Sequence, residues 1–232
     1  MKKLFLTLVI LFLSTLYLSA DTYIPGGDVS GTWELTGSPF YIEGEITIPS
    51  GETLYIEPGV DVIFNGYYKF IVNGFIEAIG TEADSILFTA ADPVTGWHSL
   101  RFFDAPDNSH LSYCIIEYGN ATGEIPDGQG GGIYCMNSNP VITYCTISDN
   151  TAEMSGGGIA CESSSPQILN CTIIYNNSFY SGPDTHGGGG IGCIYSNPLI
   201  SNCTIKGNTA NNPGGGIAFA HSDFIIEYCD IM

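Results

Sequence analysis

A glycine-rich element that returns four times in the second half of the chain limits the possible folds more than any other feature. Three glycines precede an isoleucine in each copy, and these isoleucines are Ile133, Ile159, Ile191 and Ile217. They stand 26, 32 and 26 residues apart, so the middle unit carries an insertion, which falls in the loop 178–186. Self-similarity at such a period is typical of a solenoid, in which each coil stacks on the one before it.

A cysteine-centred pattern recurs in the same units and once before them. An aliphatic residue lies three positions before each cysteine, and an isoleucine lies two positions after it. Residues two apart share one face of a strand, whereas residues three apart do so only if the backbone bends between them. Tyrosine or asparagine precedes every one of these cysteines, and asparagine tolerates the left-handed backbone that a one-residue corner can require. The cysteines are Cys114, Cys145, Cys171, Cys203 and Cys229.

Short strands, tight corners and a period in the twenties together predict an all-β coil with about three faces. Neighbouring coils would stack about 4.8 Å apart, so like residues would lie on like and form ladders in the core. The 30 glycines argue against helices, since glycine costs about 1 kcal/mol relative to alanine in a helix interior. The sequence stops in the middle of a coil at Met232, and we expect the solenoid to be truncated there.

The N-terminus has the pattern of a secretory signal peptide. Lys2 and Lys3 precede the apolar run 4–13, and the small residues Ser19 and Ala20 follow it. The run is short for a bilayer and no second hydrophobic segment follows, so we expect no transmembrane segment in the mature chain. The predicted organisation is a signal peptide at 1–20, an N-terminal cap with the first coils at 21–110, and repeated coils at 111–232.

The charge balance narrows the range of partners. The chain has 24 acidic and 5 basic residues and a formal net charge of −19, which becomes −21 when Lys2 and Lys3 leave with the signal peptide. A field of that sign repels phosphate backbones and anionic lipids and attracts cations and basic partners. We therefore predict a protein that does not bind nucleic acid.

Two stretches resemble known β-helix proteins. The Gly-Gly-Gly-Ile elements, paired with 147–150, 173–176 and 205–208, resemble the GGxI and FxxN repeats of polymorphic outer membrane proteins, with isoleucine in place of phenylalanine. The segments 51–60, 72–81, 86–89 and 96–98 resemble the opening coils of bacterial secreted proteins of the pectin-lyase-like superfamily. The resemblance covers about 29–232 and implies a right-handed parallel β-helix. It does not imply one activity, because that superfamily includes lyases, glycosidases, adhesins and passengers without known chemistry.

Eight cysteines in an exported chain would ordinarily indicate a disulfide framework. Five belong to the ladder already described, and Cys135, Cys161 and Cys193 form a second ladder in which Phe219 takes the cysteine's place. In-register side chains point the same way rather than at each other, which favours buried free thiols acting as small hydrophobic residues. Bridges and metal binding remain as alternatives, although no Cys-x-x-Cys spacing supports zinc.

Enzymatic chemistry finds little support in the residues. A lyase of this superfamily would need acidic calcium ligands beside a basic side chain that removes a proton, and the mature chain offers only Lys69, Arg101 and Lys206, none in an acidic cluster. A pectin-type glycosidase would need a Gly-His-Gly motif, but His186 follows a threonine. The sequence therefore predicts no catalytic residue, no metal ligand and no cofactor.

Weaker candidates lie in or near the corners and in the early coils. Carboxylates there could meet as general-acid pairs or calcium ligands, although solvated loop charges are commoner, and the histidines lack a recognisable partner. Tryptophans and tyrosines could stack on sugars, or Trp97 could close the start of the helix. These candidates are Asp149, Glu153, Glu162, Asp184, His98, His110, Trp33 and Trp97.

Three hypotheses follow for function. The first is a secreted or surface-displayed binding or adhesion passenger, monomeric, whose partner is a polysaccharide or a surface protein. The second is a carbohydrate-active enzyme, with a site in the loop 178–186 or beyond the given sequence. The third is an inert spacer. Exposed aromatics gathered in one groove would favour carbohydrate binding, and three carboxylates beside Arg101 or Lys206 would favour lyase chemistry. The residues favour the first hypothesis.

Overall fold

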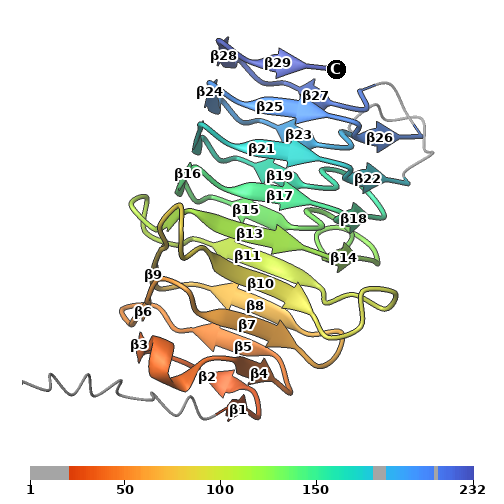
Figure 1. Ribbon diagram of the computed structural model, residues 1–232. Coiled ribbons are helices and arrows are strands. Elements are labelled where there is room, and N and C mark those ends of the chain that lie inside the picture. Colours follow the sequence, from red (N-terminus) through yellow and green to blue (C-terminus); the bar gives the residue numbers. More distant parts are fainter. Residues whose placement is uncertain (1–20, 180–186, 212–213) are drawn as a thin grey trace, which may run out of the picture.

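The chain forms a right-handed parallel β-helix, as the repeats predict (Figure 1). The structure is a computed structural model and describes residues 21–179, 187–211 and 214–232. Three long sheets, here named A, B and C, run the length of the solenoid, and every strand pair among the described residues is parallel. The predicted signal peptide and residues 180–186 of the predicted insertion lie outside the described residues.

Sheet A and sheet B have nine and eight strands. The strands of sheet A are β1 (Thr22–Ile24), β4 (Phe40–Ile42), β7 (Asp61–Phe64), β10 (Ile86–Ala90), β13 (Cys114–Glu117), β17 (Thr146–Ser148), β21 (Thr172–Ile174), β25 (Thr204–Lys206) and β29 (Asp230–Ile231). The strands of sheet B are β2 (Gly27–Asp28), β5 (Ile46–Ile48), β8 (Lys69–Val72), β11 (Ser99–Phe103), β15 (Ile133–Met136), β19 (Ile159–Glu162), β23 (Ile191–Ile194) and β27 (Ile217–Ala220).

Sheet C completes the triangle, and a short fourth sheet is present only in the later coils. The strands of sheet C are β3 (Gly31–Trp33), β6 (Thr53–Ile56), β9 (Phe75–Ile79), β12 (His110–Ser112), β16 (Val141–Thr143), β20 (Gln167–Leu169), β24 (Leu199–Ser201) and β28 (Ile225–Glu227). The short sheet consists of β14 (Asn120–Ala121), β18 (Thr151–Ala152), β22 (Asn177–Ser178) and β26 (Thr209–Ala210), and one 3-10 turn, η1, spans Leu35–Gly37.

The corners use left-handed backbone where the sequence predicts it. The residue before each cysteine of the first ladder, Cys114 to Cys229, has a positive φ, from 48° at Tyr113 to 56° at Asn170. The first glycine of the repeat element also has a positive φ at Gly130 and Gly156, a conformation that costs glycine little. Side chains on either side of such a corner can both face the core, so one buried stripe continues around each coil.

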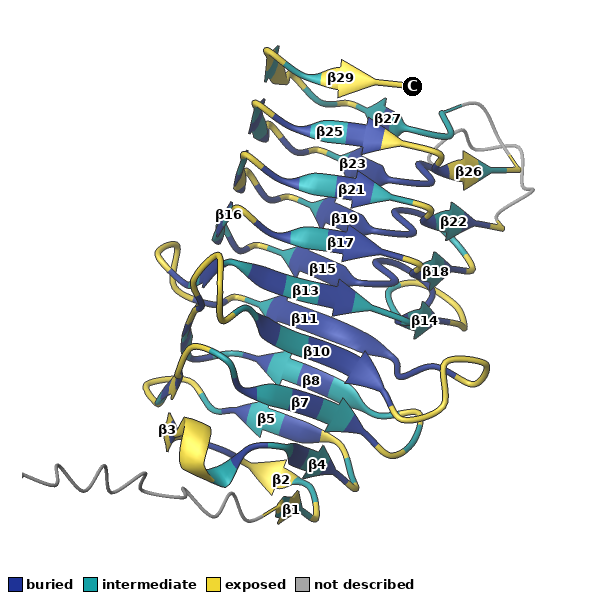
Figure 2. Ribbon diagram, in the orientation of Figure 1, coloured by how far each residue is buried: buried dark blue, intermediate teal, exposed yellow. Residues whose placement is uncertain are grey.

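The core is built of stacked rows that run along the solenoid axis (Figure 2). In one row Leu100 pairs with Ile133, and the repeat isoleucines follow in register to Ile217. Burial of each such isoleucine contributes about 1.5–3 kcal/mol, and only the neighbouring coil can supply it. Stability therefore comes from contacts between coils.

Both predicted cysteine ladders are present, and all eight cysteines are free thiols. Each ladder continues a row of ordinary hydrophobic residues: Ile86 pairs with Cys114, and Phe102 pairs with Cys135. Burial raises the pKa of the Cys145 thiol well above its usual value, which keeps it neutral. The cysteines thus fill positions that isoleucine or phenylalanine occupies in neighbouring coils.

A fourth face appears in the later coils because a buried asparagine turns the chain after sheet A. The Asn176 side chain donates to the Ile147 carbonyl at 2.8 Å and accepts from the backbone N–H of Asn150 at 3.0 Å. Asn150 and Asn208 occupy the same place in adjacent coils, so each amide satisfies backbone groups of its neighbours. The three-faced coil expected from the sequence is thereby corrected to four faces in this half.

Candidate binding site

Loops folded back over sheet B give this face an outer layer. The residues in the middle of its outward rows are buried although they point away from the core, among them Arg101, Tyr134 and Ala160. Gly130 and Gly156 lie directly against these strands, where an added Cβ would collide with the backbone of β15 or β19. These two positions in the loops therefore require glycine, and the outward side chains of sheet B are enclosed beneath them.

Beside this layer, at the corner between sheets B and C, lies a hollow of about 450 Å³. Phe103, at the end of β11, forms its aromatic part, and the remaining residues come from several coils. A hollow that combines one aromatic side chain with several convergent polar groups has the composition of a ligand site. Its lining residues are Asp28, Thr47, Pro49, Ser50, Asn73, Phe103 and Asp104.

The Phe103 ring is held from behind by two neighbours. The Arg101 guanidinium carbon lies 5.4 Å from the centroid of the ring, and the Tyr134 ring meets it edge-on at 5.7 Å. The Tyr134 hydroxyl donates to Glu162 at 2.7 Å, which fixes the tyrosine in turn. Phe103 is therefore a preorganised aromatic wall.

Arg101 joins this wall to the loop 122–130. Its Nη1 donates to the Gln129 carbonyl at 3.0 Å and its Nη2 to the Pro126 carbonyl at 2.8 Å, and its side chain has no exposed surface. Lys69 donates to Asp127 at 2.9 Å in the same loop. The cation of Lys69 helps to hold the pKa of Asp127 below its usual value, although burial of that carboxyl acts the other way. Both basic side chains thus tie the loop down.

Three buried polar atoms in or under this loop have no partner in the described part of the chain: His98 Nε2, Arg101 Nε and Gln129 Oε1. His98 is only 2% exposed, and its Nδ1 lies 3.0 Å from the Ser99 hydroxyl. Burial, with help from the charges of Arg101 and Lys69, lowers the pKa of His98 to about 3. The ring is therefore neutral at physiological pH and is not a proton donor there.

Most of the other candidates do not meet one another. Asp149 is exposed at the corner after β17, Glu153 accepts from the Gly123 N–H at 2.8 Å, and Glu162 binds Tyr134. His110 lies on sheet C, 3.2 Å from the Thr143 hydroxyl, and Lys206 is exposed on sheet A. Asp184 lies outside the described residues. Among the residues that the structure describes, no three or more side chains gather as metal ligands.

The tryptophans are not available to sugars. Trp33 is 5% exposed and stacks on Phe40, and Trp97 has no exposed surface and stacks on Phe64 at 4.2 Å. Trp97 belongs to the fourth coil, so it does not close the start of the helix either. For Trp97 the sequence gave no sign of this, because its inward direction depends on the corner between sheets A and B, and no strand pattern marks it.

Exposed tyrosines lie at several corners instead of one groove. Tyr113 and Tyr144 stack at 4.8 Å before sheet A, whereas Tyr195 stacks on His221 at 4.9 Å after sheet B. These pairs run along the axis at different edges, so each is a contact between neighbouring coils. The aromatic residue that lines the hollow between sheets B and C is Phe103, which the sequence did not single out.

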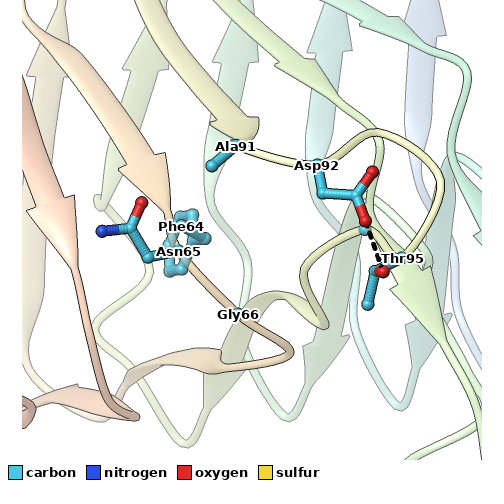
Figure 3. A pocket seen from close by; sticks show the side chains of 7 residues that line it. Phe64, Asn65, Gly66, Ala91, Asp92 and Thr95 are labelled. Carbon is cyan, nitrogen blue, oxygen red and sulfur yellow. Dashed lines mark hydrogen bonds between the residues drawn. The ribbon is translucent and has the colours of Figure 1, made fainter.

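A smaller pocket of about 230 Å³ lies at the corner between sheets A and B (Figure 3). Asn65 and Gly66 follow β7 on one side, and Asp92 and Thr95 belong to the turn after β10 on the other. The Thr95 hydroxyl donates to Asp92 at 2.6 Å, so this carboxylate stabilises its own turn. Hydrogen bonds to Thr95 and to the Val94 N–H lower its pKa.

The comparisons with known proteins agree with the architecture. A family model described as the right handed beta helix region matches residues 102–231, more than half of the chain. No significant match was found among curated proteins or among solved structures. No helix in the described residues is long and apolar enough to cross a membrane. The chain belongs to the right-handed β-helix family.

Proposed function

We propose that this β-helix is an exported, surface-displayed or secreted binding protein that contacts a neutral polysaccharide through the hollow at Phe103. The observation that carries the proposal is the preorganised Phe103 ring among convergent hydroxyl, amide and carboxylate groups. Aromatic faces bind the apolar face of a sugar ring, while the surrounding polar groups bind its hydroxyls. The predicted signal peptide at 1–20 supports export.

Charge favours a neutral ligand over an acidic one. Asp28 and Asp104 line the hollow, and the whole chain carries a formal net charge of −19. Carboxylates accept hydrogen bonds from sugar hydroxyls but repel uronates, sulfates and phosphates. Neutral glycans are therefore the expected partners.

The hydrogen bonds of the two nearby basic side chains, Arg101 and Lys69, favour binding without catalysis. Arg101 is buried and donates to loop carbonyls, and Lys69 is paired with Asp127. Neither side chain is free to remove a proton from a bound sugar, and a general base must reach the proton that it abstracts. The geometry thus supports the adhesion-type role over lyase chemistry.

The test is titration of the mature chain with neutral and acidic polysaccharides by calorimetry, with reducing and unsaturated ends followed over time. We expect binding to a neutral polymer that Phe103→Ala weakens about fivefold or more, since one aromatic contact is worth roughly 1 kcal/mol. Tyr144→Ala, on the far corner, is the matched control. Asp104→Asn keeps a residue that tolerates the left-handed φ of 48° and should also weaken binding. Equal affinity of wild type and Phe103→Ala would refute the site, and product formation would refute the non-catalytic role.

A further inference from the structure

The chain contains two Asn-Gly pairs in successive corners of the same coil, and their surroundings differ. Asn65-Gly66 follows β7, and Asn73-Gly74 lies between β8 and β9. In an Asn-Gly pair the glycine nitrogen can attack the asparagine side-chain carbonyl, because no Cβ on the second residue hinders the approach. Whether that attack occurs depends on how freely the two groups can move.

Asn73-Gly74 is held on every side. The Gly74 N–H donates to the Ile48 carbonyl at 2.9 Å, and the Asn73 N–H donates to the same oxygen at 3.0 Å. Gly74 is buried, with the carbonyls of Pro49 and Glu52 packed against its α-carbon. The nitrogen that would attack is thus occupied and cannot leave its place without breaking the corner.

In Asn65-Gly66 the backbone N–H of Asn65 donates to the Ile42 carbonyl at 2.9 Å, but the two groups that would react are not hydrogen-bonded in the described part of the chain. The Asn65 side chain is exposed and makes no hydrogen bond within the described residues, and the Gly66 N–H has no acceptor there. Asn65 lines the small pocket, and Figure 3 shows its amide directed away from Asp92 and Thr95. Its carbonyl carbon can therefore rotate toward the Gly66 nitrogen.

We propose that Asn65 is a site of spontaneous deamidation and that Asn73 is protected. The Gly66 nitrogen loses its proton to solvent and bonds to the Asn65 side-chain carbon, and ammonia leaves to give a cyclic imide. Water then opens the imide, giving aspartate or, when the main-chain bond breaks, isoaspartate. The products place a new carboxylate in the pocket that Asp92 already lines.

The experiment incubates the folded mature chain in mildly alkaline buffer and follows each pair by peptide mapping with mass spectrometry. We expect Asn65 to convert at least about tenfold faster than Asn73, because attack at Asn73 first requires breaking a buried backbone hydrogen bond and opening its corner. In urea the two rates should become similar, which separates the effect of the fold from that of the sequence. Asn65→Gln should abolish the early acidic species seen by ion exchange.

Either of two results overturns the proposal: folded chain in which Asn65 converts no faster than Asn73, or a rate difference that persists unchanged in urea. Both readouts are independent of carbohydrate binding.

Discussion

Lowering the pH from 7.5 to 5 should loosen the loop 122–130, because His98 lies beneath it as a neutral ring. Burial and the neighbouring cations hold the pKa of His98 at about 3, against 6.5 in an unfolded chain. A histidine whose pKa is lower in the folded state destabilises that state once the pH falls below its pKa in the unfolded chain, since only the unfolded form takes up the proton. The effect is absent above pH 6.5 and grows until the pH reaches about 3.

The size of the effect follows from the same two values. Each pH unit below 6.5 costs about 1.4 kcal/mol, so the penalty at pH 5 is about 2 kcal/mol. This penalty lowers the free energy of the local opening that exposes His98 to water, because a solenoid is stabilised by contacts between neighbouring coils and can open locally. The opening equilibrium should therefore rise roughly thirtyfold.

Native-state hydrogen exchange measures this opening at the Leu100 amide, which donates to the Gly132 carbonyl at 3.0 Å. The change in protection between the two pH values, corrected for intrinsic exchange, should be about 2 kcal/mol in the wild type and close to zero in His98→Gln. His110→Gln, on sheet C, is the matched control and should behave as wild type. Protection that is independent of pH in the wild type would refute the reasoning.

The remaining predictions concern the loop and the ladders. Arg101→Met removes the guanidinium donor from the Gln129 and Pro126 carbonyls, of which Pro126 keeps the Gln129 N–H at 3.1 Å, so we expect a loss of about 2–3 kcal/mol and rapid proteolysis within 122–130; Lys206→Met should leave cleavage unchanged. Asn176→Ala should lower the free energy of unfolding by about 2–4 kcal/mol, because two backbone groups of the preceding coil lose their partner, whereas Asn65→Ala, at an exposed position without a left-handed φ, should cost under about 1 kcal/mol; urea denaturation distinguishes them. Cys161→Ser buries a hydroxyl in an apolar row and should cost about 1–3 kcal/mol by the same assay, and Cys229→Ser, at the edge of the fold, should cost less.

Sequence alone determined the solenoid, its ladders and many of its corners. These features repeat in every coil, so a ladder isoleucine such as Ile159 pairs with the equivalent isoleucines of the neighbouring coils regardless of loop length. The left-handed positions at Tyr144 and Asn170 follow from the same spacing, because two inward residues three apart need a bend between them. Local periodicity and the pleat of a strand are sufficient for all of this.

Only the tertiary structure decided which residues form the candidate binding site. Lys69 and Asp127 are 58 residues apart, and the hollow at Phe103 takes Asp28 and Asn73 from other coils. Outward side chains are brought together by loops of unequal length, which carry no periodic signal. The fold of the loop 122–130 over sheet B is also what buries Arg101 and His98, because nothing in an alternating strand pattern marks an outward residue as covered.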